Sequence, residues 1–381
     1  MYDVFKVRKD SVKSSQRGLW CKKDERVLII TNDKKQVEKI SLAFYKATRK
    51  LKAFPTIVIQ PVKTLLDYAD KSVISALEAV PDVVLSISHN KLGKDEKASL
   101  NPYKTDDGRE FSSIFNYLRE GTKQIRAIWT PGLTVDMFCR TANVDYQLMK
   151  KRCEVLSEIL TNAEYVHVTS PGGTDVKVDI STRKAFSDDG DFTQKGSGGN
   201  IPAGEVYISP VVGKTDGKIV FDGSISLTSK DMLVKNPVCL EIENGFITKV
   251  YSAGQNPDLP PQKNSEAEKL LSCITEAENS AIQREKEGKI PLGQGEILKK
   301  NARNIGELGI GLNPNAKING NMLEDEKAFR TCHFAIGQNY DGDANALIHL
   351  DCLVKNPTII AFFKDGTSQV ILSNGNLVCT K

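Results

Sequence analysis

The residue types that bind metal ions are concentrated between Glu324 and Asp351. This stretch holds two of the four histidines of the chain, and it ends in I-H-L-D. His349 and Asp351 are two positions apart, so on a β-strand both side chains would leave the same face and could converge on one ion. His333 would supply the third ligand. Two imidazoles and one carboxylate suit zinc, cobalt, manganese or iron, in a hydrolytic site or in an open non-haem iron triad.

Two upstream carboxylates strengthen this metal prediction, because an isolated H-x-D pair also occurs as hydrogen-bonded core residues of a strand. Glu205 stands at the mouth of a strand in N-I-P-A-G-E-V, directly after a Pro and Gly turn. Glu307 begins a glycine-punctuated strand in N-I-G-E-L-G-I-G-L-N-P. Both carboxylates would be held rigidly at the start of their strands.

Composition excludes several classes of protein. The chain has 381 residues, enough for two domains, and a formal net charge of +4, with basic residues spread without interleaved aromatics. This pattern argues against a nucleic-acid partner. No apolar stretch reaches the length of a membrane span and no signal sequence is evident, so we expect a cytoplasmic protein. The eight cysteines form no C-x-x-C pair, which predicts reduced thiols.

The first part of the chain has the pattern of an α/β domain. Short β-branched runs alternate with amphipathic helical segments at 34–51 and 64–80. The runs are VLIIT (27–31), TIVI (56–59), VVLSIS (83–88) and IRAIW (125–129). This alternation predicts a doubly wound, mostly parallel sheet covered on both faces. No G-x-G-x-x-G follows the first strand, so a dinucleotide site is not supported.

The second part is dominated by strands. Residues 143–163 have the period of a helix that bridges two domains, and a hairpin about a P-G-G turn follows. We therefore predict an α/β domain at 1–160 and a β-rich α+β catalytic domain at 161–381. The G-S-G-G-N at 196–200 lacks a lysine and a strand-to-helix setting, so it is interpreted as a flexible loop.

Together these segments resemble the thermophilic-type metallo-aminopeptidases, the leucyl aminopeptidase and aminopeptidase T group that carries two metal ions. Six motifs follow the order of that family between residues 143 and 352. They are the G-T-D hairpin, N-I-P-A-G-E-V, G-E-L-G-I-G-L-N-P, D-E-K, C-H-F-A-I-G and I-H-L-D. The resemblance implies two zinc, cobalt or manganese ions, one bridging carboxylate and a homodimer. The implied ligands are Glu205, Glu307, His333, His349 and Asp351.

The resemblance also implies catalytic roles. Glu326 corresponds to the catalytic glutamate, with Glu324 as a neighbouring alternative, and Tyr340 to the tyrosine that stabilises the transition state. Arg330 stands where a small residue is expected. The implied reaction is removal of the first residue from peptides with a free N-terminus. A metal-bound water, with its pKa lowered to roughly 7, would be the nucleophile, Glu326 the base, and Tyr340 a donor to the oxyanion.

Two other functions remain open on the sequence. A dioxygenase branch on a similar fold uses the two histidines and the aspartate as an iron(II) triad acting on aromatic rings. The presence of Glu205 and Glu307 favours the peptidase over that branch. The third reading is a non-catalytic protein that keeps one structural metal.

Overall fold

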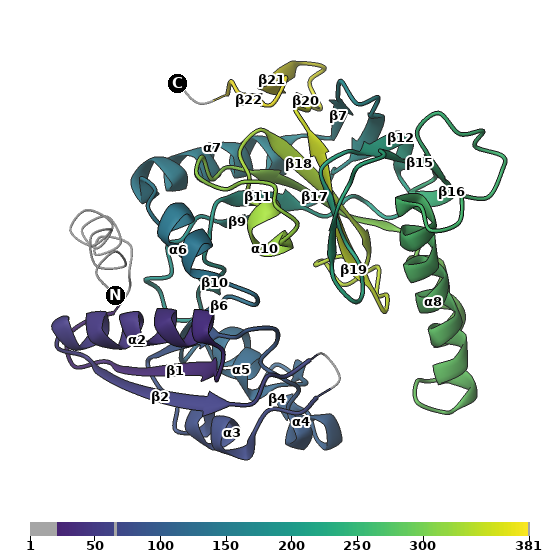
Figure 1. Ribbon diagram of the computed structural model, residues 1–381. Coiled ribbons are helices and arrows are strands. Elements are labelled where there is room, and N and C mark those ends of the chain that lie inside the picture. The colour runs from purple at the N-terminus through teal and green to yellow at the C-terminus, as the bar shows by residue number, and fades with distance from the viewer. Residues whose placement is uncertain (1–20, 65–66, 380–381) are drawn as a thin grey trace. The chain divides into compact units, whose positions relative to one another are not determined.

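The computed structural model describes residues 21–64 and 67–379, which divide into two compact units (Figure 1). The first unit contains the described residues up to Lys150 together with Asp188–Ala203. The second contains Lys151–Ser187 and the described residues from Gly204 onward. The chain thus returns to the first unit after entering the second, which a single boundary near residue 160 does not represent.

The first unit is built on a five-stranded sheet in the order β10-β6-β3-β1-β2, and every pair in it is parallel. The strands are β1 (Arg26–Asn32), β2 (Phe54–Gln60), β3 (Val83–Ile87), β6 (Arg126–Trp129) and β10 (Gly198–Gly199). Helix α2 (Lys35–Lys50) covers one face and α3 (Lys71–Glu78) the other (Figure 1). Leu28 and Ile30 of β1 pack with Val73 and Leu77 of α3. The predicted parallel, two-sided sheet is confirmed.

Residues 196–200 differ from the prediction of a flexible loop. Gly198 and Gly199 form β10, which pairs in parallel with Ala127 and Ile128 of β6. A side chain at Gly198 would lie 2.5 Å from the carbonyl oxygen of Ala127. The glycines therefore allow a close backbone approach to the sheet edge, and the resulting pairing orders the segment.

The second unit contains two large sheets, as expected for a β-rich domain. The seven-stranded sheet has the order β14-β13-β19-β18-β17-β11-β9. Its strands are β9 (Phe186–Asp188), β11 (Glu205–Ile208), β13 (Ser224–Ser226), β14 (Asp231–Leu233), β17 (Ile305–Gly311), β18 (Thr331–Gly337) and β19 (His349–Lys355). The central strands β17, β18 and β19 run antiparallel to one another, and β11 runs antiparallel to β17.

The eight-stranded sheet has the order β16-β15-β12-β8-β7-β20-β21-β22. Its strands are β7 (Tyr165–Thr169), β8 (Asp175–Asp179), β12 (Thr215–Phe221), β15 (Val238–Glu243), β16 (Phe246–Ser252), β20 (Thr358–Phe362), β21 (Ser368–Ser373) and β22 (Asn376–Leu377). Strands β7 and β8 are the predicted hairpin. Their inward-facing valines are fully buried, whereas the alternate positions are open to solvent, as the period of a half-buried strand requires.

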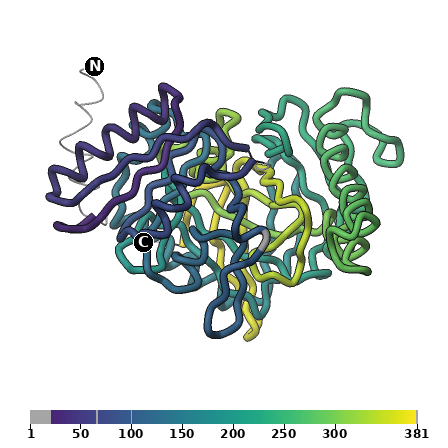
Figure 2. Tube along the Cα trace, turned by 90° about the horizontal axis from the view of Figure 1, so that it is seen from below, coloured from purple at the N-terminus to yellow at the C-terminus, as the bar shows by residue number. Residues whose placement is uncertain are grey.

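Helices of the second unit complete its core. The predicted bridging helix is α7 (Tyr146–Asn162), which buries Cys153, Leu156 and Leu160 along one side. Helix α8 (Glu266–Lys286) contacts β15 and β16 and is followed by α9 (Gln294–Asn301) (Figure 2). Ser265 caps α8 by accepting a hydrogen bond from the backbone N–H of Glu268. No helix in the described part of the chain is long and apolar enough to cross a membrane.

Candidate metal centre

The predicted metal ligands meet on one face of the central strands of the seven-stranded sheet. Glu307 on β17, Ala335 on β18 and Asp351 on β19 are paired in one row across the sheet. His333 lies two positions before Ala335, and His349 lies two positions before Asp351. Because side chains alternate with a period of two, these four functional side chains share one face. His349 and Asp351 therefore share a strand face, as their two-residue spacing predicts.

Small residues on the same face make room for the imidazoles. Gly309 is the partner of His333 across β17 and β18, and a Cβ atom at position 309 would lie 2.1 Å from the ring of His333. The ring can therefore lie across β17 only because residue 309 is glycine. The opposite face of these strands is apolar and buried, and it includes Cys332, Phe334 and Cys352. The two cysteines point away from the ligands, as strand alternation predicts.

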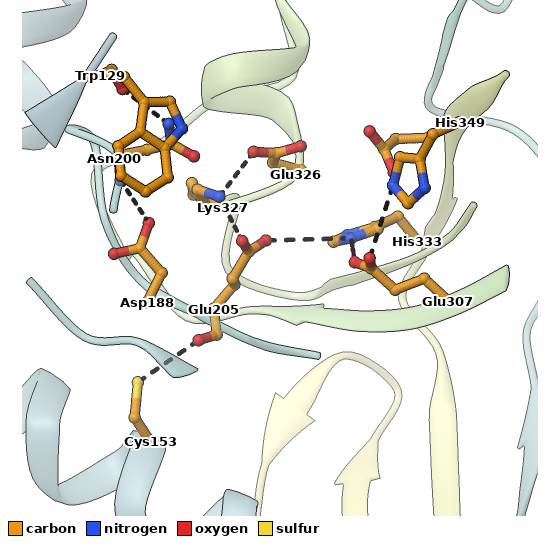
Figure 3. A network of polar contacts seen from close by, with 11 residues as sticks. Trp129, Cys153, Asp188, Asn200, Glu205, Glu307, Glu326, Lys327, His333 and His349 are labelled. Carbon is orange, nitrogen blue, oxygen red and sulfur yellow. Dashed lines mark hydrogen bonds and ion pairs between the residues drawn. The ribbon is translucent and has the colours of Figure 1, made fainter. Parts of the chain in front are cut away.

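Three members of this group, Glu307, His333 and Asp351, are close enough to share one ion, and His349 contacts two of them. The Nε2 atom of His333 lies 2.9 Å from Oε1 of Glu307. The Nε2 atom of His349 lies 3.3 Å from Oδ1 of Asp351 and 3.6 Å from Oε2 of Glu307. One ligand atom each of Glu307, His333 and Asp351 lie within 4.8 Å of one another. We call Glu307, His333, His349 and Asp351 the histidine half of the cluster, and Figure 3 labels the first three of them.

Hydrogen bonding around the histidine half fits a metal site. The Nδ1 atom of His349 lies 2.8 Å from the carbonyl oxygen of Gln338, which places the ring proton on Nδ1 and leaves Nε2 to bind an ion. Among the described residues, the buried atoms Oε2 of Glu307 and Nδ1 of His333 have no hydrogen-bond partner. An unsatisfied buried carboxylate oxygen beside two imidazoles is what a cation would stabilise.

In the metal-free protein, protons bound to the two imidazoles supply positive charge beside the buried carboxylates. Burial alone lowers the pKa of His333, but the hydrogen bond and charge of Glu307 outweigh it and raise the pKa to about 9. Burial also acts to lower the pKa of His349, but nearby acceptors, mainly Asp351, raise this pKa to about 10. Burial favours the neutral form of Asp351, yet His349 and His333 lower its pKa to about 2. In the metal-free protein both imidazoles therefore balance the carboxylates as cations.

The fifth predicted ligand, Glu205, has a different partner. Its Oε1 atom lies 2.5 Å from Nζ of Lys327, which also lies 2.6 Å from Oε1 of Glu326 (Figure 3). The Lys327 side chain is 0% exposed. Oε2 of Glu205 lies 4.0 Å from Nε2 of His333. We call Glu205, Glu326 and Lys327 the lysine half of the cluster. Lys327 is a member of the cluster that could not be predicted from the sequence, where its position in D-E-K is the one feature that marks it.

Glu326 and Glu324 have unlike surroundings. Burial raises the pKa of Glu326 to about 8, although the Lys327 ammonium acts in the opposite direction. Glu324 is fully buried, and its carboxylate accepts hydrogen bonds from the backbone N–H of Lys317 and from the side chain of Asn319, each at 2.7 Å. This arrangement makes Glu324 a structural residue and leaves Glu326 as the carboxyl group beside the cluster.

Arg330 occupies a position where the resemblance implied a small residue. Its φ angle is 71°, in the left-handed region that favours glycine. The expectation of a small residue thus has a backbone reason, and this chain places an arginine there against that preference.

An aromatic row borders the histidine half. The rings of Tyr340 and His349 have centroids 5.2 Å apart, and Tyr340 lies at the same distance from Tyr207. Phe186 stacks on Tyr207 at 5.7 Å with an interplanar angle of 25°. Although the Tyr340 ring is exposed, desolvation and the carboxylates of Glu307 and Asp351 raise the pKa of its hydroxyl group. The hydroxyl group therefore stays protonated and can donate a hydrogen bond.

One known protein family matches part of the chain. Residues 118–259 match the family model of 2,5-dihydroxypyridine 5,6-dioxygenase. This stretch contains Glu205 and ends before the histidine half. No curated protein matches the chain.

Two solved structures have a similar fold over nearly the whole chain. A 2,5-dihydroxypyridine dioxygenase from Pseudomonas putida is 17% identical, with a TM-score of 0.67, and the match covers 99% of this chain and 98% of the other. AmpT from Thermus thermophilus is 15% identical, with a TM-score of 0.60, and the match covers 98% and 100%. The chain therefore has the fold shared by an aminopeptidase T and a dioxygenase, and the family model favours the dioxygenase.

The prediction of a metallo-aminopeptidase, a peptide hydrolase, is wrong. The family match and the dioxygenase structure support the alternative reading instead. The error has a physical cause. In the sequence, Glu205 and Glu307 favour a peptidase, but a carboxylate in the sequence does not reveal its partner. In the structure Glu205 is ion-paired with Lys327.

Proposed function

We propose that this protein is an iron(II)-dependent dioxygenase that opens a hydroxylated aromatic ring. The observation that carries the proposal is the placement of His333, His349 and Asp351 on one face of two adjacent strands. Two imidazoles and one carboxylate on one side of an ion leave its other positions open, and this ligand set is typical of non-haem iron oxygenases. Glu307 lies beside the triad and could serve as a further ligand or as a hydrogen-bond acceptor.

The substrate class follows from the relatives and from the aromatic row. The family model and one structural neighbour are named for 2,5-dihydroxypyridine, so we propose a hydroxylated nitrogen heterocycle as the substrate. Tyr207 and Tyr340 offer ring faces beside His349 on which a planar ring could stack. The protonated hydroxyl group of Tyr340 could donate a hydrogen bond to a ring oxygen.

When bound, iron(II) would supply the redox chemistry that brings dioxygen and ring together. His333, His349 and Asp351 would hold it. Glu326 would exchange a proton with a ring hydroxyl group through its carboxyl oxygen, since a pKa of about 8 suits proton transfer near neutral pH. In the overall reaction one ring carbon–carbon bond breaks and both atoms of dioxygen enter the product. The substrate supplies all four electrons, and no external reductant is consumed.

Oxygen uptake tests the proposal. Protein freed of metal with a chelator is loaded with iron(II) without air and mixed with 2,5-dihydroxypyridine in aerated buffer. We expect one dioxygen consumed per ring, with loss of the ring absorbance, and none of either with zinc-loaded protein. A dihydroxybenzoate serves as the carbocyclic comparison. The proposal fails if iron-loaded protein consumes no oxygen with either ring.

A further inference from the structure

Lys327 is a fully buried cation held by two carboxylates, and the fold fixes its position. The carbonyl oxygen of Lys327 accepts a hydrogen bond of 2.8 Å from the backbone N–H of Asn313, at the end of β17. A Cβ atom at Gly311 would lie 2.1 Å from the carbonyl oxygen of Ala328, so glycine lets this segment approach the strand. The Lys327 side chain then enters the cluster between Glu205 and Glu326 (Figure 3).

A buried ammonium group is retained only where its charge is well compensated. Its desolvation is expensive unless carboxylates pair with it, and here two lie at 2.5 and 2.6 Å. Removing the ammonium would take from both carboxylates the cation that lies at hydrogen-bond distance. Within the described residues of the lysine half the ammonium group is thus the balancing cation. Oε2 of Glu205, which has no hydrogen-bond partner in the described part of the chain, lies toward the histidine half, 4.0 Å from Nε2 of His333.

The same place is where a second metal ion would have to sit. Paired catalytic ions lie roughly 3.5–4 Å apart and share carboxylates. Glu205 is the carboxylate next to the histidine half, since its Oε2 lies 4.0 Å from Nε2 of His333. An ion on Oε1 of Glu205 would share that oxygen with the ammonium, placing two buried positive charges less than about 5 Å apart.

We infer that the Lys327 ammonium group takes the place of a second metal ion, so that the cluster binds one divalent ion per chain, through the histidine half. This inference rests on the metal site of the proposed function. It replaces the expectation of two ions and makes Glu205 a partner of Lys327 and not a metal ligand. A single ion with open positions is also what oxygen chemistry at a facial triad needs.

Metal counting tests the inference without substrate or oxygen. Metal-free protein is titrated with Mn²⁺ alone, and bound ion is measured by elemental analysis and by the electron paramagnetic resonance of Mn²⁺. We expect wild-type protein to saturate at one equivalent, without spin coupling between ions. Lys327→Met keeps the length of the side chain and removes its charge. This variant should bind two equivalents and show coupling, because Glu205 and Glu326 become available.

Lys249→Met is the matched control. Lys249 also pairs with two carboxylates, Glu241 at 3.5 Å and Asp258 at 2.6 Å, but on the surface of the second unit. This variant should bind one equivalent, like wild type. If Lys327→Met does not fold, Glu205→Gln replaces it, and its count should stay at one.

Three outcomes would overturn the inference. The first is two equivalents of Mn²⁺ bound by wild-type protein. The second is one equivalent bound by folded Lys327→Met. The third is loss of the ion in Glu205→Gln. The count is independent of the ring-cleavage assay, so the two proposals can fail separately. One equivalent without oxygen uptake would refute the proposed function alone, whereas oxygen uptake with two equivalents in wild type would refute only the role of Lys327.

Discussion

The two halves of the cluster contain the same carboxylate chemistry and neutralise it in different ways. In the histidine half, Glu307 and Asp351 face imidazoles that can give up a proton and accept a metal ion. In the lysine half, Glu205 and Glu326 face an ammonium group that is part of the chain and cannot be exchanged. The identity of the buried cation therefore determines which carboxylates are available to a metal.

Loss of an imidazole should have the largest effect, because it breaks the histidine half. We expect His349→Ala to lose the ion and all measurable ring cleavage, with metal affinity falling by more than about 10²-fold, the upper end for outer partners of a metal site. Elemental analysis after gel filtration measures the loss. His167→Ala is the matched control, because His167 pairs with Asp175 at 2.7 Å on the surface. Full metal content in His349→Ala would exclude this histidine as a ligand.

Glu326→Gln should separate the two halves. The amide cannot exchange a proton, so kcat should fall by roughly 10²- to 10⁴-fold while the metal content stays at the wild-type value. Steady-state kinetics on metal-loaded protein measures this. Glu324→Gln should lower Tm and keep kcat, because the Glu324 carboxylate accepts structural hydrogen bonds from Lys317 and Asn319. The reverse pattern would transfer the proton-exchanging role to Glu324.

Gly309→Ala should disturb the histidine half without removing a ligand. Its methyl group would collide with the His333 ring, and overpacking of this kind costs about 1–3 kcal/mol. We expect a lower Tm and, because the ring must move, metal affinity roughly 10-fold weaker. Calorimetric titration of metal-free protein gives the affinity. Unchanged affinity and Tm would mean that His333 does not lie across β17 as described.

Changing pH should alter the stability that the histidine half contributes, and this effect should be smaller than those of the substitutions above. The pKa values of His333 and His349 are raised to about 9 and 10, so their contribution to stability is complete below pH 6.5 and is lost as pH rises through these values. Asp351 has a lowered pKa of about 2, so its contribution is present above 3.8 and is lost as pH falls through 2. Metal-free protein should therefore have a lower Tm at pH 10 than at pH 6.

The protonation of the two histidines can also be measured through the protons that are released when a metal ion binds. At pH 7 the incoming ion displaces the ring protons, so about two protons should be released for each ion bound. Calorimetry in buffers of different ionisation enthalpy counts them. Release of no protons would mean that the imidazoles are neutral in the metal-free protein or do not bind the ion.

Much of the fold and part of the site could be predicted from the sequence. The alternating runs in the first part predicted a parallel sheet, and the two-residue spacing of His349 and Asp351 predicted a shared strand face. These features follow from local periodicity. The placement of Glu307 and His333 on that same face required knowledge of strand order, which came only from the resemblance.

The lysine half could not be predicted in this way. Lys327 stands in a charged stretch, E-D-E-K, of a kind usually found in solvent, and its burial depends on contacts with Asn313 and the space at Gly311. A glycine that is needed because another backbone segment passes close to it produces no periodic pattern in the sequence. The sequence does not reveal the pairing of Glu205 with Lys327, and for this reason Glu205 supports the wrong expectation of peptide hydrolysis.

The proposal depends most on a metal centre in the histidine half that cleaves a ring with dioxygen. Labelling dioxygen with an isotope is the most direct way to check it. Iron(II)-loaded protein is given 2,5-dihydroxypyridine under ¹⁸O₂, and the product is analysed by mass spectrometry. We expect a ring-opened product that carries both labelled atoms, and no such product from His349→Ala. An unlabelled product, or an intact ring at full iron occupancy, would contradict the proposal.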